Sequence, residues 1–450
     1  MSRVNIISYA VKGIKNIDKM ISLSFYKKTI GRDFDVKGYN LKGIYGTNGA
    51  GKTGIIASVK ILKRLLTEQN YLTNPVIQNE LHELINRITN ELVINIEYLW
   101  RDTENMILFD YEIRLVRNES GQYEIGHEIL TRKKALSYSS SPVVCFETAG
   151  GRLITNNNGE YSGMIEDQTK NLLSRCTMVS VILGKEELYK SISEKKNEIW
   201  TNVMSLALLG GNLYICLDEG DNHSKYHMNH YLYSQEELNI NDFDVFCRQM
   251  RQLNGRNAGE FTVVPVLVEK DRYKAYEERV NHLYEFLHIF KDDLAAVDID
   301  RKENGSCYSC SLVLNYGDYA VNAEFESTGI KKLIKLYDAF DQMVHGGIVF
   351  IDELDSNLHD VYLCALLEYL MENAKGQLCF TTHNVGPMDV LKKNKKSIDF
   401  LSADHEIYPW VTNGNYSPAN LYKKGMIEGS PFNVFPYEFI KAFYVEGDDE

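Results

Sequence analysis

The sequence predicts an α/β protein: a mixed sheet with an antiparallel flank plus a parallel core, with an inserted helical arm or subdomain. Consecutive strand-like segments, such as LVINIEYLW (92–100) and MILFDYEIRLV (106–116), predict the antiparallel flank. Helix and strand patterns alternate from about 326 to 401, which predicts βαβ units and therefore parallel strands. Mainly helical patterns between 185 and 295 predict the insertion.

Composition excludes several classes of protein. The 450 residues are 44% apolar and 25% charged, as in an ordinary globular protein. A formal charge of −13 disfavours attraction of the whole molecule to nucleic acid or acidic lipid, although the basic runs 132–134 and 392–396 leave local DNA contact open. We expect a cytoplasmic protein with reduced cysteines and no membrane partner, because no stretch approaches eighteen apolar residues and the start lacks a signal-peptide pattern.

The elements follow one another in a simple order. Strands are expected around residue 6, at 21–25 and at 41–45, and a helix from Lys52 to about Leu66 follows them. Further along, SCSLVL and YAVNAEF predict two strands joined by a hairpin turn at 315–318.

A helix within 271–294 has apolar residues spaced by three and four alternately. Such a seam fits an amphipathic helix packed on its own domain, or else an intermolecular coiled coil, and three heptads favour the first. The seam consists of Tyr273, Tyr276, Val280, Leu283, Leu287, Phe290 and Leu294.

The segment GIYGTNGAGKTG predicts a phosphate-binding loop. Gly46, Gly51, Lys52 and Thr53 satisfy G-x-x-x-x-G-K-[ST] between an apolar strand and a helix, a context that disfavours a mere glycine-rich turn. Glycines let backbone N–H groups converge on phosphate oxygens at a helix N-terminus. Lys52 is expected to reach the β- and γ-phosphates of ATP, and the Thr53 hydroxyl to bind Mg²⁺.

Two apolar runs end in adjacent carboxylates. LYICLDEGDNH contains Asp218 and Glu219, and GIVFIDELDSNLH contains Asp352 and Glu353. Only the second run is followed by a helix and then by a strand, QLCFTTHN, that carries His383. This order favours the second pair and makes the first a surface turn.

The favoured carboxylates have separate expected roles. Asp352 can hold Mg²⁺ through water, Glu353 can polarise the attacking water, and His383 can reach the γ-phosphate.

These motifs together resemble those of ABC-type ATPases. GTNGAGKT, with Asn48 and Gly49 and followed by Gly54, is similar to their phosphate loop, FIDELDSNLHD to their Walker B motif and D-loop, and TTHN to their switch histidine. FESTGIKKLIKLY resembles their signature motif, with Ser327 and Gly329 opening a helix about twenty residues before Walker B.

The resemblance implies a P-loop ABC-type ATPase head that works as a pair. In this family the signature serine binds the nucleotide on the opposite subunit, so one chain with one P-loop implies a homodimer or higher homo-oligomer joined head to tail around MgATP. Asp355 in the D-loop would lie at that interface. The chain looks most like the SMC-like branch that includes the OLD proteins and small ATPases of bacterial phage defence.

The expected domain organisation follows from the motif positions. Residues 1–184 form the first part of the head with Walker A, 185–300 the helical insertion, and 301–450 the second part of the head. The chain has no room for long coiled coils, and no Toprim nuclease follows His383, so an effector such as a nuclease would be a separate partner. No Q-loop glutamine is assigned.

Two metal-like patterns remain. His223, His227 and His230 have a spacing that suits Zn²⁺ on a helix, but nearby glycine and asparagine favour an exposed loop. Cys307 and Cys310 resemble a zinc hook superficially and fall on an expected strand. Neither pattern is favoured as a metal site.

The leading hypothesis is an ATPase that dimerises around MgATP and controls a partner effector in antiphage defence. Two alternatives stay open: a nucleotide-gated oligomeric scaffold that holds an effector, for which the 273–294 seam would be suited, and a DNA-repair-type ATPase acting on DNA. A GTPase is disfavoured because the chain has no Asn-Lys-x-Asp segment.

Overall fold

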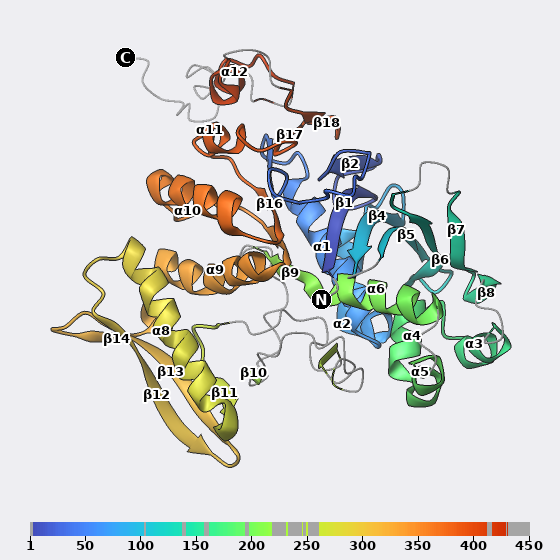
Figure 1. Cartoon of the computed structure of the whole chain (residues 1–450), viewed down its shortest axis with the longest axis horizontal. Coiled ribbons are helices and arrows are strands. Elements are labelled where there is room, and N and C mark those ends of the chain that lie inside the picture. Colours follow the sequence, from blue (N-terminus) through green and yellow to red (C-terminus); the bar gives the residue numbers. More distant parts are fainter. Residues whose placement is uncertain are drawn as a thin grey trace, which may run out of the picture.

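The structure is a computed structural model. It contains three sheets with helices around them (Figure 1). The parts of the chain that it describes are residues 3–102, 105–136, 141–156, 162–193, 198–217, 231–232, 245, 249–250, 261–411, 416–428 and 430.

The antiparallel flank is a seven-stranded sheet in the order β2-β1-β4-β5-β6-β7-β8. Every neighbouring pair in it is antiparallel, which confirms this part of the predicted fold. Its strands are β1 (Arg3–Lys12), β2 (Ile21–Ser24), β4 (Glu91–Arg101), β5 (Met106–Arg117), β6 (Tyr123–Lys134), β7 (Val143–Ala149) and β8 (Arg152–Asn156).

The core sheet has six strands in the order β18-β17-β3-β16-β15-β9. All its pairs are parallel except β17 with β18, as predicted for the core. Successive side chains of β15 enter different apolar clusters, Ile348 and Phe350 on one face and Val349 and Ile351 on the other, so the sheet is covered on both faces. The strands are β3 (Leu41–Gly46), β9 (Leu213–Cys216), β15 (Ile348–Ile351), β16 (Gln377–Thr381), β17 (Ile398–Leu401) and β18 (Ile407–Pro409).

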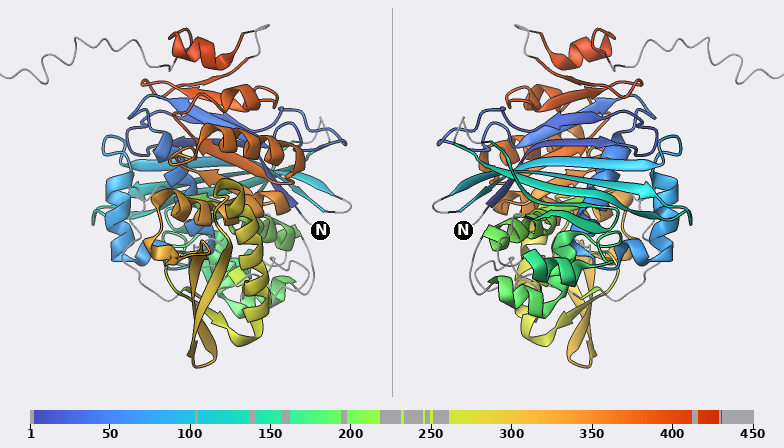
Figure 2. Two further views of the ribbon diagram at one scale, coloured as in Figure 1. Left: turned by 90° about the vertical axis from the view of Figure 1, so that its left-hand side faces the viewer. Right: turned by 90° about the vertical axis from the view of Figure 1, so that its right-hand side faces the viewer.

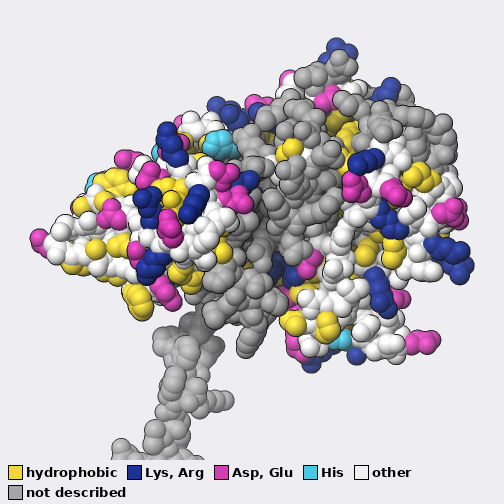
Figure 3. Space-filling view, turned by 90° about the horizontal axis from the view of Figure 1, so that it is seen from below, with side chains coloured by type: hydrophobic (Ala, Val, Ile, Leu, Met, Phe, Trp, Pro, Cys, Tyr) yellow, Lys and Arg dark blue, Asp and Glu magenta, His cyan; other side chains and the backbone are white. Residues whose placement is uncertain are grey.

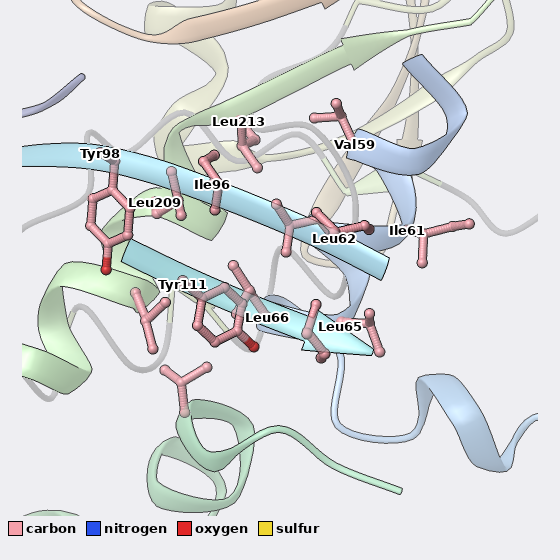
Figure 4. Close-up of a cluster of buried hydrophobic side chains, with 14 of the residues drawn as sticks. Val59, Ile61, Leu62, Leu65, Leu66, Ile96, Tyr98, Tyr111, Leu209 and Leu213 are labelled. Atoms are coloured by element: carbon pink, nitrogen blue, oxygen red, sulfur yellow. The ribbon is translucent and has the colours of Figure 1, made fainter. Parts of the chain in front are cut away.

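Helix α1 (Lys52–Thr67) lies between the flank and the core sheet. Figure 4 shows its side chains, among them Leu62 and Leu66, beside Ile96 of β4 and Tyr111 of β5. A helix enclosed on several sides must be apolar nearly all round, which explains the run IIASVKILKRLL.

The remaining helices belong to the two apolar clusters that cover the faces of the core sheet. Apolar side chains of α9 and α10 pack on the face of the core sheet opposite α1. These helices are α2 (Pro75–Leu84), α3 (Ser162–Thr169), α4 (Met178–Gly184), α5 (Glu186–Ser193), α6 (Glu198–Asn212), α9 (Thr328–His345), α10 (Asp360–Asn373), α11 (Met388–Leu391) and α12 (Pro418–Lys423).

The arm projects from the head on the side away from α12 (Figures 1 and 2). It consists of α8 (Tyr273–Phe290) and a small sheet, so the insertion is not helical throughout. Because β12 crosses residue 300 and pairs along its length with β13, the sheet uses residues on both sides of the predicted boundary. Its strands are β10 (Tyr231–Leu232), β11 (Val266–Glu269), β12 (Ala296–Asn304), β13 (Cys307–Asn315) and β14 (Ala320–Asn322).

The apolar seam of α8 is used within its own chain. Tyr276, Val280, Leu283 and Leu287 are buried in a cluster formed with the arm sheet and the start of α9. The interpretation as a helix packed on its own domain is therefore confirmed. The seam is not exposed for an intermolecular coiled coil.

Strand β9 shows that the predicted insertion also contributes to the head. It pairs in parallel with β15, with Cys216 opposite Ile351. The division into 1–184, 185–300 and 301–450 stays a prediction, but the LYIC segment inside its middle part belongs to the core sheet.

A buried amide joins the two large sheets. The register of β1 on β4 shifts between Ile6 and Ser8, and Gln377 at the start of β16 hydrogen-bonds to the backbone of Ile6. The Ile6 N–H donates to Gln377 Oε1 at 2.7 Å, and Gln377 Nε2 donates to the Ile6 carbonyl at 2.9 Å. The side chain thus satisfies both backbone groups in a place that water does not reach.

Among the described residues there is no membrane-spanning helix and no cluster of metal ligands. Every helix there is too short or too polar to cross a bilayer. No group of three or more His, Cys, Asp or Glu side chains there is placed to hold a metal ion. Cys307 and Cys310 lie three residues apart on β13, so their side chains point to opposite faces of the strand. His223, His227 and His230 lie outside the described residues.

A fully buried carboxyl lies inside the flank. Glu128 on β6 accepts hydrogen bonds from the Tyr111 hydroxyl at 2.8 Å and from the backbone N–H of Met178, the first residue of α4, at 3.0 Å. Burial raises the pKa of Glu128 from its ordinary value of 4.5 to about 7, although both hydrogen bonds act in the other direction.

This raised pKa predicts a pH-dependent stability. The folded protein binds the Glu128 proton more tightly than the unfolded chain does, so the contribution is complete below pH 4.5 and is lost as pH rises through about 7. The loss amounts to about 3 kcal/mol. We expect Glu128→Gln, which cannot ionise, to unfold at a higher urea concentration than the wild type at pH 8 and at a similar one at pH 4.5. Parallel profiles for the two proteins between these values would contradict the assignment.

Candidate nucleotide-binding site

Three parallel strands bring the candidate residues to one edge of the core sheet. In register, Ile44 of β3 lies opposite Thr381 of β16, and Ile351 of β15 lies opposite Phe380. The strands therefore end together. The glycine-rich loop continues β3, the Asp-Glu pair continues β15 and the TTHN segment continues β16, at the edge where open α/β sheets bind ligands.

The glycine-rich loop needs glycine at its two ends. A Cβ on Gly46 would lie 2.5 Å from the Leu401 carbonyl oxygen, because β17 approaches β3 closely there. Gly51 has φ 105° at the N-cap of α1, and a Cβ on it would lie 2.7 Å from the Ile17 side chain. Asn48 and Gly49 between these ends are exposed, and Gly54 packs in the first turn of α1.

The turn after β1 contacts and supports the glycine-rich loop. Asn16 Nδ2 donates to the carbonyl of Gly49, and Ile17 contacts the site of Gly51. The contact fixes the loop from a segment more than thirty residues earlier in the chain. Asn16 is a site-supporting residue that the sequence analysis missed, because no local pattern connects it with the glycines.

The ammonium of Lys52 is held at the mouth of the loop. Its Nζ donates to the carbonyls of Gly46 and Thr47 at 2.9 and 3.1 Å. Burial lowers the pKa of Lys52, while the negative charges of Asp352, Glu353 and Asp355 raise it. These electrostatic effects place all three carboxylates near the lysine.

Thr381 organises the Asp-Glu pair. Its hydroxyl donates to Asp352 Oδ1 at 2.5 Å and accepts the backbone N–H of Glu353 at 2.8 Å. Glu353 has φ 46°, a left-handed backbone that costs a non-glycine residue about 1–3 kcal/mol. Asp352 is 2% exposed, whereas Glu353 is only partly buried and can face the loop.

His383 lies at the exposed side of the same edge. Partial removal from water lowers its pKa, and the positive charge of Lys52 lowers it further, against the opposing effect of Asp355 and Asp352. Its imidazole is therefore neutral at pH 7. Asp355 is half-buried, and its Oδ1 atom is buried without a hydrogen-bond partner.

Ser327 lies on a separate surface. It caps α9 by accepting the N–H of Ile330 at 3.4 Å, and its side chain is exposed at the N-terminus of an 18-residue helix. Gly329 lies in the first turn, where a Cβ would be 3.3 Å from the carbonyl oxygen of Asn357 in the D-loop. Ser327 hydrogen-bonds to Glu326 and Ile330, and no hydrogen bond joins it to Lys52 or the Asp-Glu pair, so the candidate residues fall into two groups.

Thr53 and Asp352 are suited to Mg²⁺ by their chemistry. A hydroxyl and a carboxylate are the hard oxygen ligands that this ion prefers. Thr53 follows Lys52 in the first turn of α1, and Lys52 lies within the electrostatic reach of Asp352. Asp218 and Glu219, the disfavoured pair, lie outside the described residues, although β9 before them ends beside β15, where the Asp352 N–H donates to the Cys216 carbonyl at 2.8 Å.

Both basic runs considered for DNA contact include side chains paired with carboxylates of the same chain, as Arg132 is with Glu198. Lys392 and Lys393 contact Asp389 and Glu368 at 2.8 and 2.7 Å. On the side of the molecule away from α11, the face seen in Figure 3, the Lys and Arg side chains of the described residues are likewise interspersed with Asp and Glu. This distribution is typical of a solvated surface.

The double hydrogen bond of Thr381 predicts a specific loss of stability. Thr381→Val keeps the shape of the side chain but leaves the Glu353 N–H and Asp352 Oδ1 without the hydroxyl. We expect the free energy of unfolding, measured in urea, to fall by about 2 kcal/mol, and Thr381→Ser to recover most of it. Equal stabilities of the Val and Ser variants would show that the hydroxyl is not needed.

Part of the chain matches a known protein family. Residues 266–389 match the family described as "AAA domain, putative AbiEii toxin, Type IV TA system". No curated protein sequence matches the chain. Solved structures similar to 91% of the chain include an SMC head bound to the C-winged helix domain of ScpA (13% identity, 98% of that chain, TM-score 0.40). Others are the SMC head domain from Thermotoga maritima (14%, 100%, TM-score 0.34) and the recombination mediator protein RecF with ATPrS (9%, 99%, TM-score 0.35).

The matched segment contains Ser327, the Asp-Glu pair and His383. Residues 266–389 are thus similar to an AAA ATPase domain family, which confirms the predicted resemblance to this class of ATPases, and the glycine-rich loop lies outside the matched segment.

Proposed function

We propose that the chain binds MgATP between two copies arranged head to tail, hydrolyses the ATP, and controls a separate effector through the change between engaged and disengaged states. One observation carries this proposal. Five ionisable groups, from segments 300 or more residues apart in the sequence, lie near one another at one sheet edge. They are Lys52, Asp352, Glu353, Asp355 and His383.

In this proposal the triphosphate lies along the glycine-rich loop. Backbone N–H groups at the start of α1 bind its oxygens, and Lys52 exchanges its two loop carbonyls for phosphate oxygens. Thr53 and Asp352 would hold Mg²⁺, which offsets the charge on the phosphates when bound. The residues that contact the nucleotide directly are Gly46, Asn48, Gly49, Gly51, Lys52, Thr53 and Gly54.

Glu353 is the proposed general base. Its carboxylate orients and polarises the water that attacks the γ-phosphate. His383, neutral at pH 7, donates a hydrogen bond to a γ-phosphate oxygen. The contacts of Thr381 fix the backbone on which the carboxylates lie, so that both are oriented before the reaction.

The second copy completes the site. Ser327 and the N-terminus of α9 are suited to bind an anion, and no hydrogen bond joins Ser327 to Lys52 within the chain. A head-to-tail pair would place Ser327 of each copy on the nucleotide of the other, with Asp355 at the interface. The exposure of Ser327 supports this arrangement, because the serine can face a neighbour.

The effector is proposed to be a separate protein acting in antiphage defence. The family description of the matched segment refers to a putative AbiEii toxin and a type IV toxin–antitoxin system, which supports this context. The α8 seam no longer supports the scaffold alternative, because the seam is buried in its own chain. The pairing of Lys392 and Lys393 with carboxylates likewise gives no support to DNA binding.

The proposed base gives a direct test of hydrolysis. Glu353→Gln should lower kcat for ATP by about 10²- to 10⁴-fold, because the amide cannot accept the proton. ATP binding, measured by equilibrium dialysis, should persist because the loop contacts are unchanged. Glu368→Gln, an exposed carboxylate on α10, is the matched control. Undiminished turnover in Glu353→Gln would exclude this residue as the base.

The proposed dimer gives an independent test. Ser327→Arg fills the space in which the serine would meet the neighbour's γ-phosphate, so ATP-dependent dimerisation should be lost while each copy still binds ATP. Sedimentation velocity with ATP, in the Glu353→Gln background to prevent turnover, measures this. Asn304→Arg on the exposed arm hairpin carries the same added bulk and charge as a control. A dimer that forms equally well with Ser327→Arg would refute the arrangement.

A further inference from the structure

Lys332 on α9 makes two contacts that no motif predicts. Its ammonium donates to the carbonyl oxygen of Glu353 at 2.5 Å and to the hydroxyl of Ser356. Both acceptors lie in the segment that follows β15. The helix opened by Ser327 is thereby joined, within one chain, to the residue proposed as the general base.

The acceptor peptide has an unusual backbone. Glu353 has φ 46°, its N–H donates to Thr381, and its carbonyl also accepts the N–H of Ser356 at 3.1 Å. The carbonyl held by Lys332 is part of the peptide unit that determines the direction of the Glu353 side chain. A shift of Lys332 along α9 would therefore turn the carboxylate as well.

The first half of α9 is also packed against the arm. Ile330, Leu333 and Ile334 are buried in the apolar cluster that contains the α8 seam, and Arg279 of α8 forms a buried ion pair with Asp338 of α9. The helix segment that carries Lys332 thus shares its packing with the arm. If the N-terminus of α9 moved, the movement would affect Lys332 and the contacts with the arm as well as Ser327.

We propose that Lys332 is a positioning residue that makes the orientation of Glu353 depend on the position of α9. This inference rests on the proposed head-to-tail dimer. There, Ser327 of one copy contacts the nucleotide of one composite site, whereas Glu353 of the same copy acts in the other site. Lys332 then couples the two sites, so that a nucleotide seated on α9 of a copy aligns the general base of that copy.

The test compares Lys332→Met, Lys332→Arg and Lys375→Met. Methionine keeps the length of the side chain but removes the donor, arginine keeps a donor and the charge, and Lys375 is an exposed lysine just after the C-terminal end of α10. Three quantities are measured for each full-length protein: kcat with the Hill coefficient for ATP hydrolysis, ATP affinity by equilibrium dialysis, and ATP-dependent dimerisation by sedimentation in the Glu353→Gln background.

We expect Lys332→Met to lower kcat on the order of 100-fold, as for a misplaced catalytic group. Its Hill coefficient should fall to about 1, from a wild-type value between about 1 and 2 for two coupled sites. ATP affinity and dimerisation should stay within about twofold of the wild type, because no loop or signature contact is removed. Lys332→Arg should recover most of the activity and cooperativity, and Lys375→Met should behave as the wild type.

Two results would overturn the inference while leaving the proposed function intact. One is an unchanged kcat and Hill coefficient in Lys332→Met, with normal ATP-dependent dimers. The other is loss of dimerisation together with activity, since Lys332 would then serve the structure of α9 and not the alignment of Glu353. If instead the wild type neither dimerises with ATP nor hydrolyses it, the proposed function fails first.

Discussion

The register of three parallel strands is the constraint on which the site depends. Strands β3, β16 and β15 end together, so a slip of one residue would move the Asp-Glu pair by about 3.3 Å relative to the glycine-rich loop. Both faces of this sheet are apolar, so burial alone does not penalise such a slip as it would in a one-sided sheet. Polar contacts fix the register of these strands instead. Thr381 joins the ends of β16 and β15, and Gln377 fixes the start of β16 to the flank.

Helix α9 belongs to two apolar cores at once. Its first half packs with the arm through residues such as Leu333, and its second half packs on the core sheet through residues such as Phe340. A helix shared in this way cannot move with one part and stay fixed to the other unless one set of contacts gives way. The buried Arg279–Asp338 pair adds to the cost of separating α8 from α9, because each charge would be left in a place from which water is excluded. The arm is therefore built to follow the helix that carries Ser327.

The sequence predicts those features whose geometry is local. The glycine-rich loop, the Ser327 cap and the α8 helix each depend on neighbouring residues, and each lies where the pattern predicts it. The partners of these elements could not be predicted, because periodicity shows that α8 has an apolar face and not what covers it. The sequence shows β9 as an apolar run but leaves it in the helical insertion, since no helix and strand follow it as they follow β15, and β15 itself lies more than 130 residues later. Lys332, Thr381 and Asn16 left no sequence signal because each acts on a distant segment.

Charge explains why the proposed triphosphate site needs its glycines. Asp352, Glu353 and Asp355 surround a single lysine, so the side chains near Lys52 carry more negative than positive charge. This excess raises the pKa of Lys52 against the larger, lowering effect of burial, but it does not attract phosphate. The attraction must come from backbone N–H groups at the start of α1, which converge only where glycines permit the loop's left-handed turns. Lys52 already donates to two carbonyls of that loop, and phosphate oxygens can replace them without loss of hydrogen bonds. In the proposed site, backbone N–H groups therefore bind the phosphates, and the side chains at the sheet edge are available for the hydrolysis step.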